Sequence, residues 1–372
     1  MALKEEEMKQ DERYQAYKRL WPKRIPHWEP LSCPDGMTYC TGIDFYEHPR
    51  LCALKMNEMY PMLYAGVPDK DEPIPRPDLD GKSNSVSIDE HGRRSVRWGA
   101  STSSHWDWGI KFKDVEEVLA FSPLELGDFT DLPLNEARDY RDEEKLFQVY
   151  STHFPAEWGG KLPEGEWEYV GFYNTMIMWP ILTFGWELFL EAALDPRFER
   201  IMDEFAEINR RVFRTFTRLP VTHVLCHDDI VGSRGPYMSP AWMRKFIFPR
   251  YEEFWGILRE AGKEVIMITD GCADVFVDDI FACGAVGIFT EPYTDFKAIA
   301  RKHENCFLVG EGDNRVLCRN NPEEIKAMVH SMIETSKMTG GYMMGIGNHI
   351  PWNTSPEGLK LYLDLCHELA HR

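Results

Sequence analysis

Five short apolar runs in the second half of the sequence each end in an acidic residue or a histidine. The runs cover residues 221–230, 264–271, 285–292, 306–313 and 342–350. Apolar runs of this length, separated by helical patterns, are typical of buried parallel strands. In a closed α/β barrel the carboxyl ends of all strands meet at one mouth, so we expect the polar residues to converge there. These residues are His227, Asp228, Asp229, Asp270, Glu291, Glu311, Asp313 and His349.

Helix signals between these runs support an α/β fold of the (β/α)8 TIM-barrel type with an N-terminal elaboration. Ser239-Pro240, Asn321-Pro322 and Ser355-Pro356 each place a capping side chain before a proline, which is typical of a helix start. Gly340-Gly341 indicates a helix end. A further strand is predicted over residues 168–173, and strand–helix alternation continues from residue 166 to residue 372.

The length of 372 residues fits a single elaborated barrel domain that spans residues 1–372. Residues 1–110 form the elaboration, with a helix near the start and a hairpin around Glu90-His91-Gly92. Residues 166–372 hold the regular β/α units.

Composition excludes several classes of partner. The net charge of −19 disfavours nucleic acid and anionic membrane surfaces. No apolar stretch is long enough to span a bilayer, and the highly charged start lacks the apolar centre of a secretory signal. Nine scattered cysteines without a CxxC pair indicate reduced thiols, so we expect a cytoplasmic protein.

The run His227-Asp228-Asp229 is the densest group of ionisable residues, and burying three of them without a task is costly. Structural alternatives remain for the other strand ends. Asp270 fits a turn or a helix cap, and Glu291 a salt bridge at the rim. The run Glu311–Arg315 contains an acid and a base that can pair with each other. His349 is either a hydrogen-bonded structural residue or a member of the mouth.

Histidine and carboxylate side chains on separate strands can also form an open zinc site, which keeps one position for a substrate oxygen. The sequence has no HExxH or CxxC spacing. In a barrel mouth, however, ligands are far apart along the chain, so this absence does not decide the question.

The segments HDDI, MSPAWMRKFIFPRYEEFW, VIMITDG, GEGDNRVL and GNHIPWNTSP together resemble the uroporphyrinogen decarboxylase superfamily. The resemblance runs from about residue 171 to the C-terminus and implies a single (β/α)8 barrel. Members of the superfamily decarboxylate uroporphyrinogen without a cofactor, or transfer a methyl group to the cobalt of a corrinoid protein.

Two departures narrow the resemblance. The RQAGRY motif with which the decarboxylases anchor porphyrinogen carboxylates is absent, and a substrate with eight carboxylates is hard to bind without arginines. The zinc cysteines of the methanogen methyltransferases are absent as well, because the corresponding places hold Ile268-Thr269-Asp270 and Gly347-Asn348-His349. With RWG at residues 97–99, the chain is most similar to the methyltransferase component of O-demethylases.

That resemblance implies transfer of a methyl group from an aromatic ether of the guaiacol, veratrol or vanillate type to cobalt(I). The corrinoid would be carried by a partner protein. The chain itself is also compatible with a homodimer. The barrel would make the oxygen leave, by a proton or by a metal such as zinc. We expect catalysis from His227, Asp228 and Asp270, substrate contacts from Tyr173, Asn174, Tyr237 and Arg315, and metal ligation from His227, Glu311 and His349.

Two other functions remain open from the sequence. One is a lyase of the decarboxylase type that acts on a different carboxylic acid and needs no corrinoid. The other is a barrel that binds a ligand or partner without catalysis, with its acids serving the structure.

Overall fold

The computed structural model describes most of the chain. It covers residues 11–29, 31, 33–63, 66–76, 86–88, 94–98, 101–104, 112–125, 140–152, 167–173 and 175–372. Within residues 86–104 and 167–169 it describes the backbone alone. All structural statements below concern these residues.

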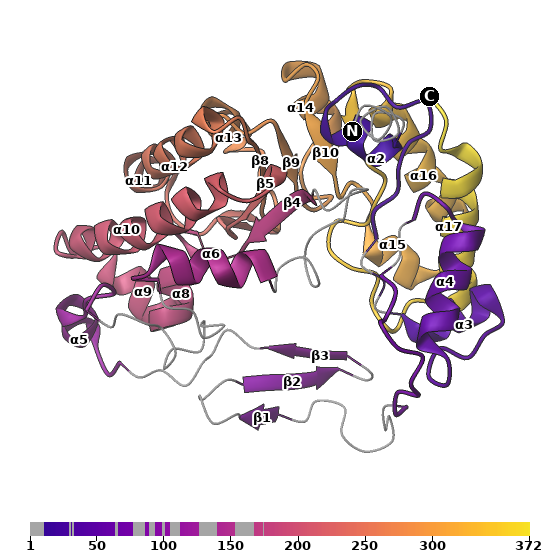
Figure 1. The fold of residues 1–372 in the computed structure, drawn as a ribbon, viewed down its shortest axis with the longest axis horizontal. Coiled ribbons are helices and arrows are strands. Elements are labelled where there is room, and N and C mark those ends of the chain that lie inside the picture. Colours follow the sequence, from indigo (N-terminus) through magenta and orange to yellow (C-terminus); the bar gives the residue numbers. More distant parts are fainter. Residues whose placement is uncertain are drawn as a thin grey trace.

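A six-stranded parallel sheet forms the centre of the fold (Figure 1). Its strands, in spatial order, are β4 (Trp167–Phe172), β5 (Val221–His227), β8 (Glu264–Ile268), β9 (Gly287–Phe289), β10 (Phe307–Val309) and β11 (Gly341–Tyr342). Every neighbouring pair in this sheet is parallel, as the apolar runs predict. The α/β barrel-type fold is thereby confirmed.

An N-terminal segment continues the sheet beyond β11. His27 and Leu31 form parallel bridges with Met344 and Ile350. The Trp28 N–H donates to the Met344 carbonyl at 2.8 Å, and the Met344 N–H donates to the Pro26 carbonyl at 2.9 Å. His27, Trp28 and Leu31 therefore lie in the barrel wall, beside its last strand.

Helices connect the parallel strands in sequence order. They are α8 (Met178–Phe184), α9 (Trp186–Ala192) and α10 (Phe198–Thr217) before β5; α11 (Pro240–Phe246) and α12 (Phe248–Glu260) before β8; α13 (Val277–Ala282) before β9; α14 (Phe296–Lys302) before β10; α15 (Asn314–Arg319) and α16 (Pro322–Ser336) before β11; and α17 (Pro356–Leu369) at the end. The short strands β6 (Val231–Gly232) and β7 (Gly235–Pro236) form a hairpin directly after β5.

The first half of the chain contributes smaller elements. They are α2 (Glu12–Tyr17), α3 (Pro34–Thr41), α4 (Pro49–Met59), α5 (Val115–Ala120), α6 (Glu143–Thr152) and the antiparallel strands β1 (Val86–Ile88), β2 (Arg94–Trp98) and β3 (Ser101–Ser104). The antiparallel pairing expected on either side of residues 90–92 is confirmed, with Ile88 opposite Arg94, whereas the turn itself lies outside the described residues.

Capping side chains begin the helices where the sequence indicates. Ser239, Asn321 and Ser355 each accept a hydrogen bond from a main-chain N–H in the first turn of α11, α16 and α17. The predicted end of α16 is wrong by four residues, because the helix stops at Ser336 rather than at Gly340. The strands are also shorter than the apolar runs, and residues 343–350 make only isolated bridges.

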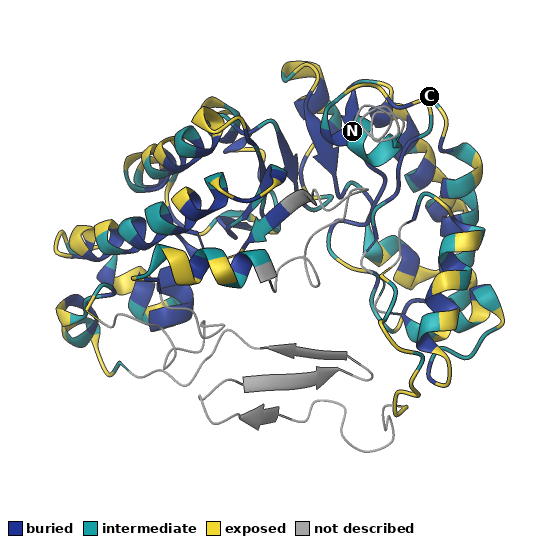
Figure 2. Cartoon of the chain, in the orientation of Figure 1, coloured by how far each residue is buried: buried dark blue, intermediate teal, exposed yellow. Residues whose placement is uncertain are grey.

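Burial follows the strand and helix patterns (Figure 2). All residues of β9 and β10 are buried, as expected for strands covered on both faces. Helix α10 buries one stripe, which includes Phe205, Val212 and Phe216, and exposes the other. All nine cysteines are free, and most are buried. Among the described residues, no helix combines the length and apolar character needed to cross a bilayer.

Glu29 joins the N-terminal segment to the rest of the barrel. Its buried carboxylate accepts from the Ile346 N–H at 3.1 Å and from the Tyr362 hydroxyl, and it pairs with His27 Nε2 at 2.8 Å. This residue did not stand out in the sequence, because two of its three partners, Ile346 and Tyr362, are more than 300 positions away.

We expect Glu29→Ala to lower the free energy of unfolding by about 3–5 kcal/mol, because it leaves several buried polar groups without a partner. Denaturant unfolding measures the change. Glu199→Ala, at an exposed position in the first turn of α10, is the control and should change stability by less than about 0.5 kcal/mol. An equal effect of both substitutions would contradict the role of Glu29.

Candidate active site at the strand ends

The carboxyl ends of β5, β8 and β9 are aligned by main-chain hydrogen bonds that continue past the strands. The Asp228 N–H donates to the Ile268 carbonyl at 3.0 Å, and the Thr269 N–H donates to the Phe289 carbonyl at 3.1 Å. The residues that follow β5 and β8 therefore lie at one level of the mouth, as the barrel geometry predicts.

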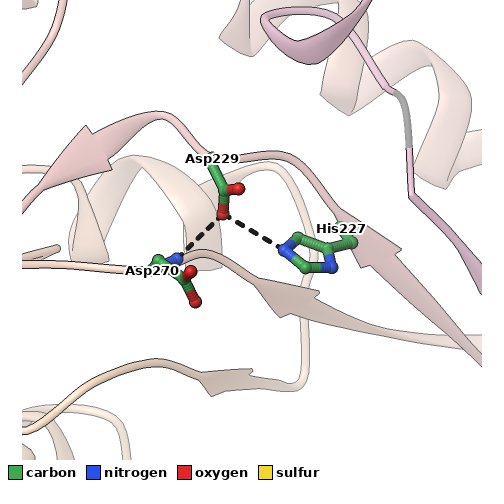
Figure 3. A group of neighbouring side chains, drawn as sticks. All are labelled: His227, Asp229 and Asp270. Atoms are coloured by element: carbon green, nitrogen blue, oxygen red, sulfur yellow. Dashed lines mark hydrogen bonds and ion pairs between the residues drawn. The ribbon is translucent and has the colours of Figure 1, made fainter. Parts of the chain in front are cut away.

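His227, Asp229 and Asp270 form a compact cluster at this level (Figure 3). Asp229 lies between the other two. Its Oδ1 is 3.1 Å from His227 Nε2 and accepts the Asp270 main-chain N–H at 3.0 Å. One nitrogen or oxygen atom from each of the three side chains lies within 4.8 Å of the others. Such a group can hold a proton or a metal ion.

The two carboxyl groups of the cluster have different protonation behaviour. Burial and the neighbouring charges of Asp229 and Glu291 raise the pKa of Asp270 to about 7. Burial also disfavours the charged form of Asp229, but the hydrogen bond from His227 and the Asp270 N–H lower the pKa of Asp229 below its ordinary value. Asp229 is therefore ionised at neutral pH, while Asp270 retains its proton in a large fraction of molecules.

The turn that carries Asp270 is held rigidly. Gly271 has a φ of 84°, and a Cβ atom there would lie 2.4 Å from the Gly232 carbonyl carbon. Its N–H donates to Glu291 Oε2 at 2.7 Å, and its carbonyl accepts from the hydroxyls of Thr290 and Thr294 at 3.2 Å. Only glycine fits this position, so the Asp270 side chain is presented by a fixed backbone.

Aromatic side chains line the mouth beside the cluster. The Tyr173 ring centroid lies 4.1 Å from that of His227, and the Tyr173 hydroxyl donates to Asp229 Oδ2 at 3.5 Å. Tyr237 packs against Trp186 at 4.6 Å. Tyr173 and Tyr237 each keep 38% of their surface exposed, so both can contact a bound molecule. Their roles as substrate contacts stay predictions.

Asp228 has a structural position, in place of the catalytic one expected from the sequence. Its carboxylate is completely buried. It accepts from the main-chain N–H groups of Met176, Ile177 and Met178 at 2.6–3.0 Å and from the Tyr251 hydroxyl at 2.6 Å. These donors occupy its acceptor positions and keep it away from the mouth.

The predicted metal set of His227, Glu311 and His349 is not brought together. Glu311 is turned toward α16, where it accepts from Ser331, Thr335 and the Tyr342 hydroxyl at 2.7–3.2 Å. The structure places Asp229 and Asp270 beside His227 instead. The sequence did contain a signal for Asp229, since residues two apart in an extended chain point to the same side.

His349 is exposed, and Asn348 links it to the cluster. Its Nδ1 donates to Asn348 Oδ1 at 2.7 Å, and Asn348 Nδ2 donates to Asp270 Oδ2 at 3.3 Å. Asn348 was not recognised from the sequence, because an asparagine after an apolar run is usually a turn residue.

Arg315 and Asn174 are the other two residues that the sequence suggests as substrate contacts. Arg315 donates to both oxygens of Asp313 at 2.8 Å and lies over the Tyr293 ring at 4.3 Å. Its guanidinium is therefore already engaged by a carboxylate, as the structural alternative anticipated. Asn174 lies outside the described residues, so its role as a substrate contact stays a prediction.

The raised pKa of Asp270 predicts a pH-dependent effect of Asp270→Asn on stability. An aspartate in an unfolded chain titrates near pH 4. The contribution of Asp270 to the free energy of unfolding therefore falls as pH rises from about 4 to about 7. Asparagine removes this loss. We expect the variant to exceed the wild type by on the order of 2 kcal/mol at pH 8, with the advantage disappearing toward pH 4. Thermal unfolding between pH 4 and 9 measures it, and a pH-independent difference would refute the shifted pKa.

Comparison with known proteins bears on the same half of the chain. A search among curated proteins gives no match. Among solved structures, a xylose isomerase-like TIM barrel protein from Mycobacterium smegmatis in complex with magnesium is 12% identical, with a TM-score of 0.28, and the alignment covers 70% of this chain and 100% of that one. The sequence model of the family described as Uroporphyrinogen decarboxylase (URO-D) matches residues 193–369. This match contains the β5 and β8 strand ends, and it supports a relation of residues 193–369 to the uroporphyrinogen decarboxylase superfamily.

Proposed function

We propose that the protein is the methyltransferase component of an O-demethylase. It would move the methyl group of a methoxylated aromatic ring to the cobalt(I) of a corrinoid carried by a partner protein. The observation that supports this most directly is Asp270, a carboxyl group that retains a proton near neutral pH at the mouth, beside His227 and exposed aromatic rings.

The chemistry requires the ether oxygen to leave as a phenol. A corrinoid bound on the partner would supply, through its cobalt(I), the electron pair for the new bond to the methyl carbon. The electrons of the broken carbon–oxygen bond would remain on the oxygen. A phenolate is a poor leaving group, because its conjugate acid has a pKa of about 10. Proton transfer from a positioned acid removes this barrier and accounts for the phenol product.

Asp270 is suited to be that acid. Its pKa of about 7 leaves it protonated often enough at neutral pH, and it is still acidic enough to give the proton to a departing phenolate. Its turn is fixed by Gly271 and Glu291, so the carboxyl group is pre-positioned. The His227–Asp229 pair lies beside it and can return a proton through the imidazole after each turnover.

Tyr173 and Tyr237 are placed to hold a flat ring over the cluster. Both rings are partly exposed at the strand ends, and the Tyr173 hydroxyl is already oriented by Asp229. An apolar aromatic wall with few polar groups is what a small aromatic ligand requires.

The same three residues also fit a divalent metal. One imidazole nitrogen and two carboxylate oxygens form a donor set that Zn²⁺ and related ions accept, with open positions for substrate. A bound ion would polarise the ether oxygen as a Lewis acid. His227, Asp229 and Asp270 would hold it, and Tyr173 would then act as a hydrogen-bond partner of the Asp229 ligand.

We expect a reduced corrinoid protein to lose its cobalt(I) absorbance when this protein and a guaiacol- or veratrol-like ether are both present, and not when either is omitted. Chromatography should detect the matching phenol in equal amount. Release of carbon dioxide from an aromatic or pyrrolic acid without any corrinoid, together with no loss of cobalt(I), would support the lyase instead.

His227→Ala should lower the rate of methyl transfer by at least tenfold while the fold persists, because it removes the partner of Asp229 from the mouth. Circular dichroism checks the fold. Elemental analysis of both proteins distinguishes the two roles of the cluster. A metal that is present in the wild type and lost in the variant assigns ligation, whereas metal-free active wild type assigns proton transfer. Full activity of His227→Ala would remove the residue from the site.

A further inference from the structure

The loops that follow the parallel strands are strongly acidic. They comprise residues 173–177, 228–239, 269–276, 290–295, 310–313 and 343–355. Aspartate and glutamate occur in four of the six, whereas Arg234 is the only lysine or arginine in any of them. Asp228 and Glu311 are turned away from the mouth, and Asp313 is paired with Arg315. The acids that remain beside the cluster are Asp229, Asp270 and Glu291, so the described part of the mouth differs in charge from a site built to bind an acid.

Three of these carboxyl groups act on the same place. Burial raises the pKa of Tyr237 to about 12, with further contributions from the charges of Asp229, Asp270 and Glu291. Tyr237 is one of the two partly exposed rings, so these charges are felt where a ligand would lie. The imidazole of His227 in the same cluster is hydrogen-bonded to Asp229.

The two arginines in or beside these loops, Arg315 and Arg234, either already pair with a carboxylate or lie in an exposed turn. Arg315 uses two N–H groups on Asp313 and its flat face on Tyr293. Arg234 is exposed in the turn between β6 and β7. Among the described strand-end residues, none offers the converging arginine fork that a buried carboxylate requires.

We propose that the mouth, with its His227–Asp229–Asp270 cluster free of metal, selects methoxylated rings by charge: it accepts neutral and ammonium-bearing rings and rejects carboxylated ones, vanillate among them. The inference rests on the proposed function and names the substrate class of the same site. A carboxylated ring would lose water and meet Asp229 and Glu291 without a compensating partner. A neutral ring loses little hydration free energy when it enters the mouth. An ammonium group is attracted by the carboxylates and by the faces of the tyrosine rings.

The test compares three ligands that share one methyl ether and differ only in charge: 4-methoxytoluene, 4-methoxybenzylamine and 4-methoxybenzoate. Calorimetry gives each dissociation constant without a corrinoid protein. We expect the benzoate to bind at least tenfold more weakly than the toluene, and the benzylamine to bind at least as tightly as the toluene. Higher salt should reduce both differences.

Two variants assign the selectivity to named residues. Glu291→Gln keeps an acceptor for the Gly271 N–H but removes a charge, so the benzoate penalty should fall at least threefold. Glu311→Gln is the matched control: its carboxylate faces Ser331, Thr335 and Tyr342, and the penalty should not change. Thermal unfolding verifies that both variants are folded.

A third variant should create the missing cation. Asp313→Asn preserves the N-cap of α15, since asparagine also accepts from the Arg315 N–H, and it frees the Arg315 side chain from its carboxylate. We expect it to improve binding of the benzoate selectively. No change in that variant would show that Arg315 does not reach the ligand, and would remove this residue from the explanation.

The outcomes separate this inference from the proposed function. Tightest binding of the benzoate, lost on Arg234→Ala, would overturn the charge selection and make Arg234 a carboxylate anchor. The expected order of binding without any methyl transfer would leave the selection intact and refute the methyltransferase. Failure of all three rings to bind would overturn both.

Discussion

Three consecutive main-chain N–H groups, from Met176, Ile177 and Met178, converge on the carboxylate of Asp228, and the mouth of the barrel depends on this contact. It joins the loop after β4 to the end of β5, and the Tyr251 hydroxyl adds a bond from α12. A charge without water requires such a set of donors. Successive residues of an extended chain point in alternate directions. Because Asp228 points toward its donors, His227 and Asp229 point the opposite way, toward the mouth.

The two aspartates at the mouth differ in protonation because their surroundings differ. Asp229 is stabilised as an anion by His227 and by the Asp270 N–H. That anion, together with burial and Glu291, then disfavours a second charge on Asp270. One carboxylate therefore keeps the other protonated, and the pair separates into an orienting group and an acid. The Asp270 main-chain N–H donates to Asp229, so the protonation of the two carboxyl groups is coupled.

The backbone around the cluster leaves little freedom. Gly271 lies against Gly232, and its amide and carbonyl are both bound by residues that follow β9. Glu291 thus contributes a hydrogen bond that positions Asp270 and a charge that affects its proton. In the proposed function, the charges that raise the pKa of Asp270 also disfavour an anionic ligand, so proton transfer and the choice of substrate would have one physical origin.

Much of the fold was predictable from the sequence. The apolar runs identified the parallel strands, and Ser239, Asn321 and Ser355 identified helix starts, because both signals depend on residues adjacent in the chain. The strand-end rule also found His227 and Asp270. Strand limits were overestimated, since residues after Tyr342 are apolar but pair only at isolated positions.

The sequence by itself determined which polar residues stand at the ends of the strands, because that follows from local periodicity. Only the tertiary structure decided which of them face the mouth. Asp228 is withdrawn by donors 50 residues earlier, and Glu311 by hydroxyls 20 to 31 residues later. Such partners are brought near by packing between elements, so the spacing of residues along the chain carries no record of them.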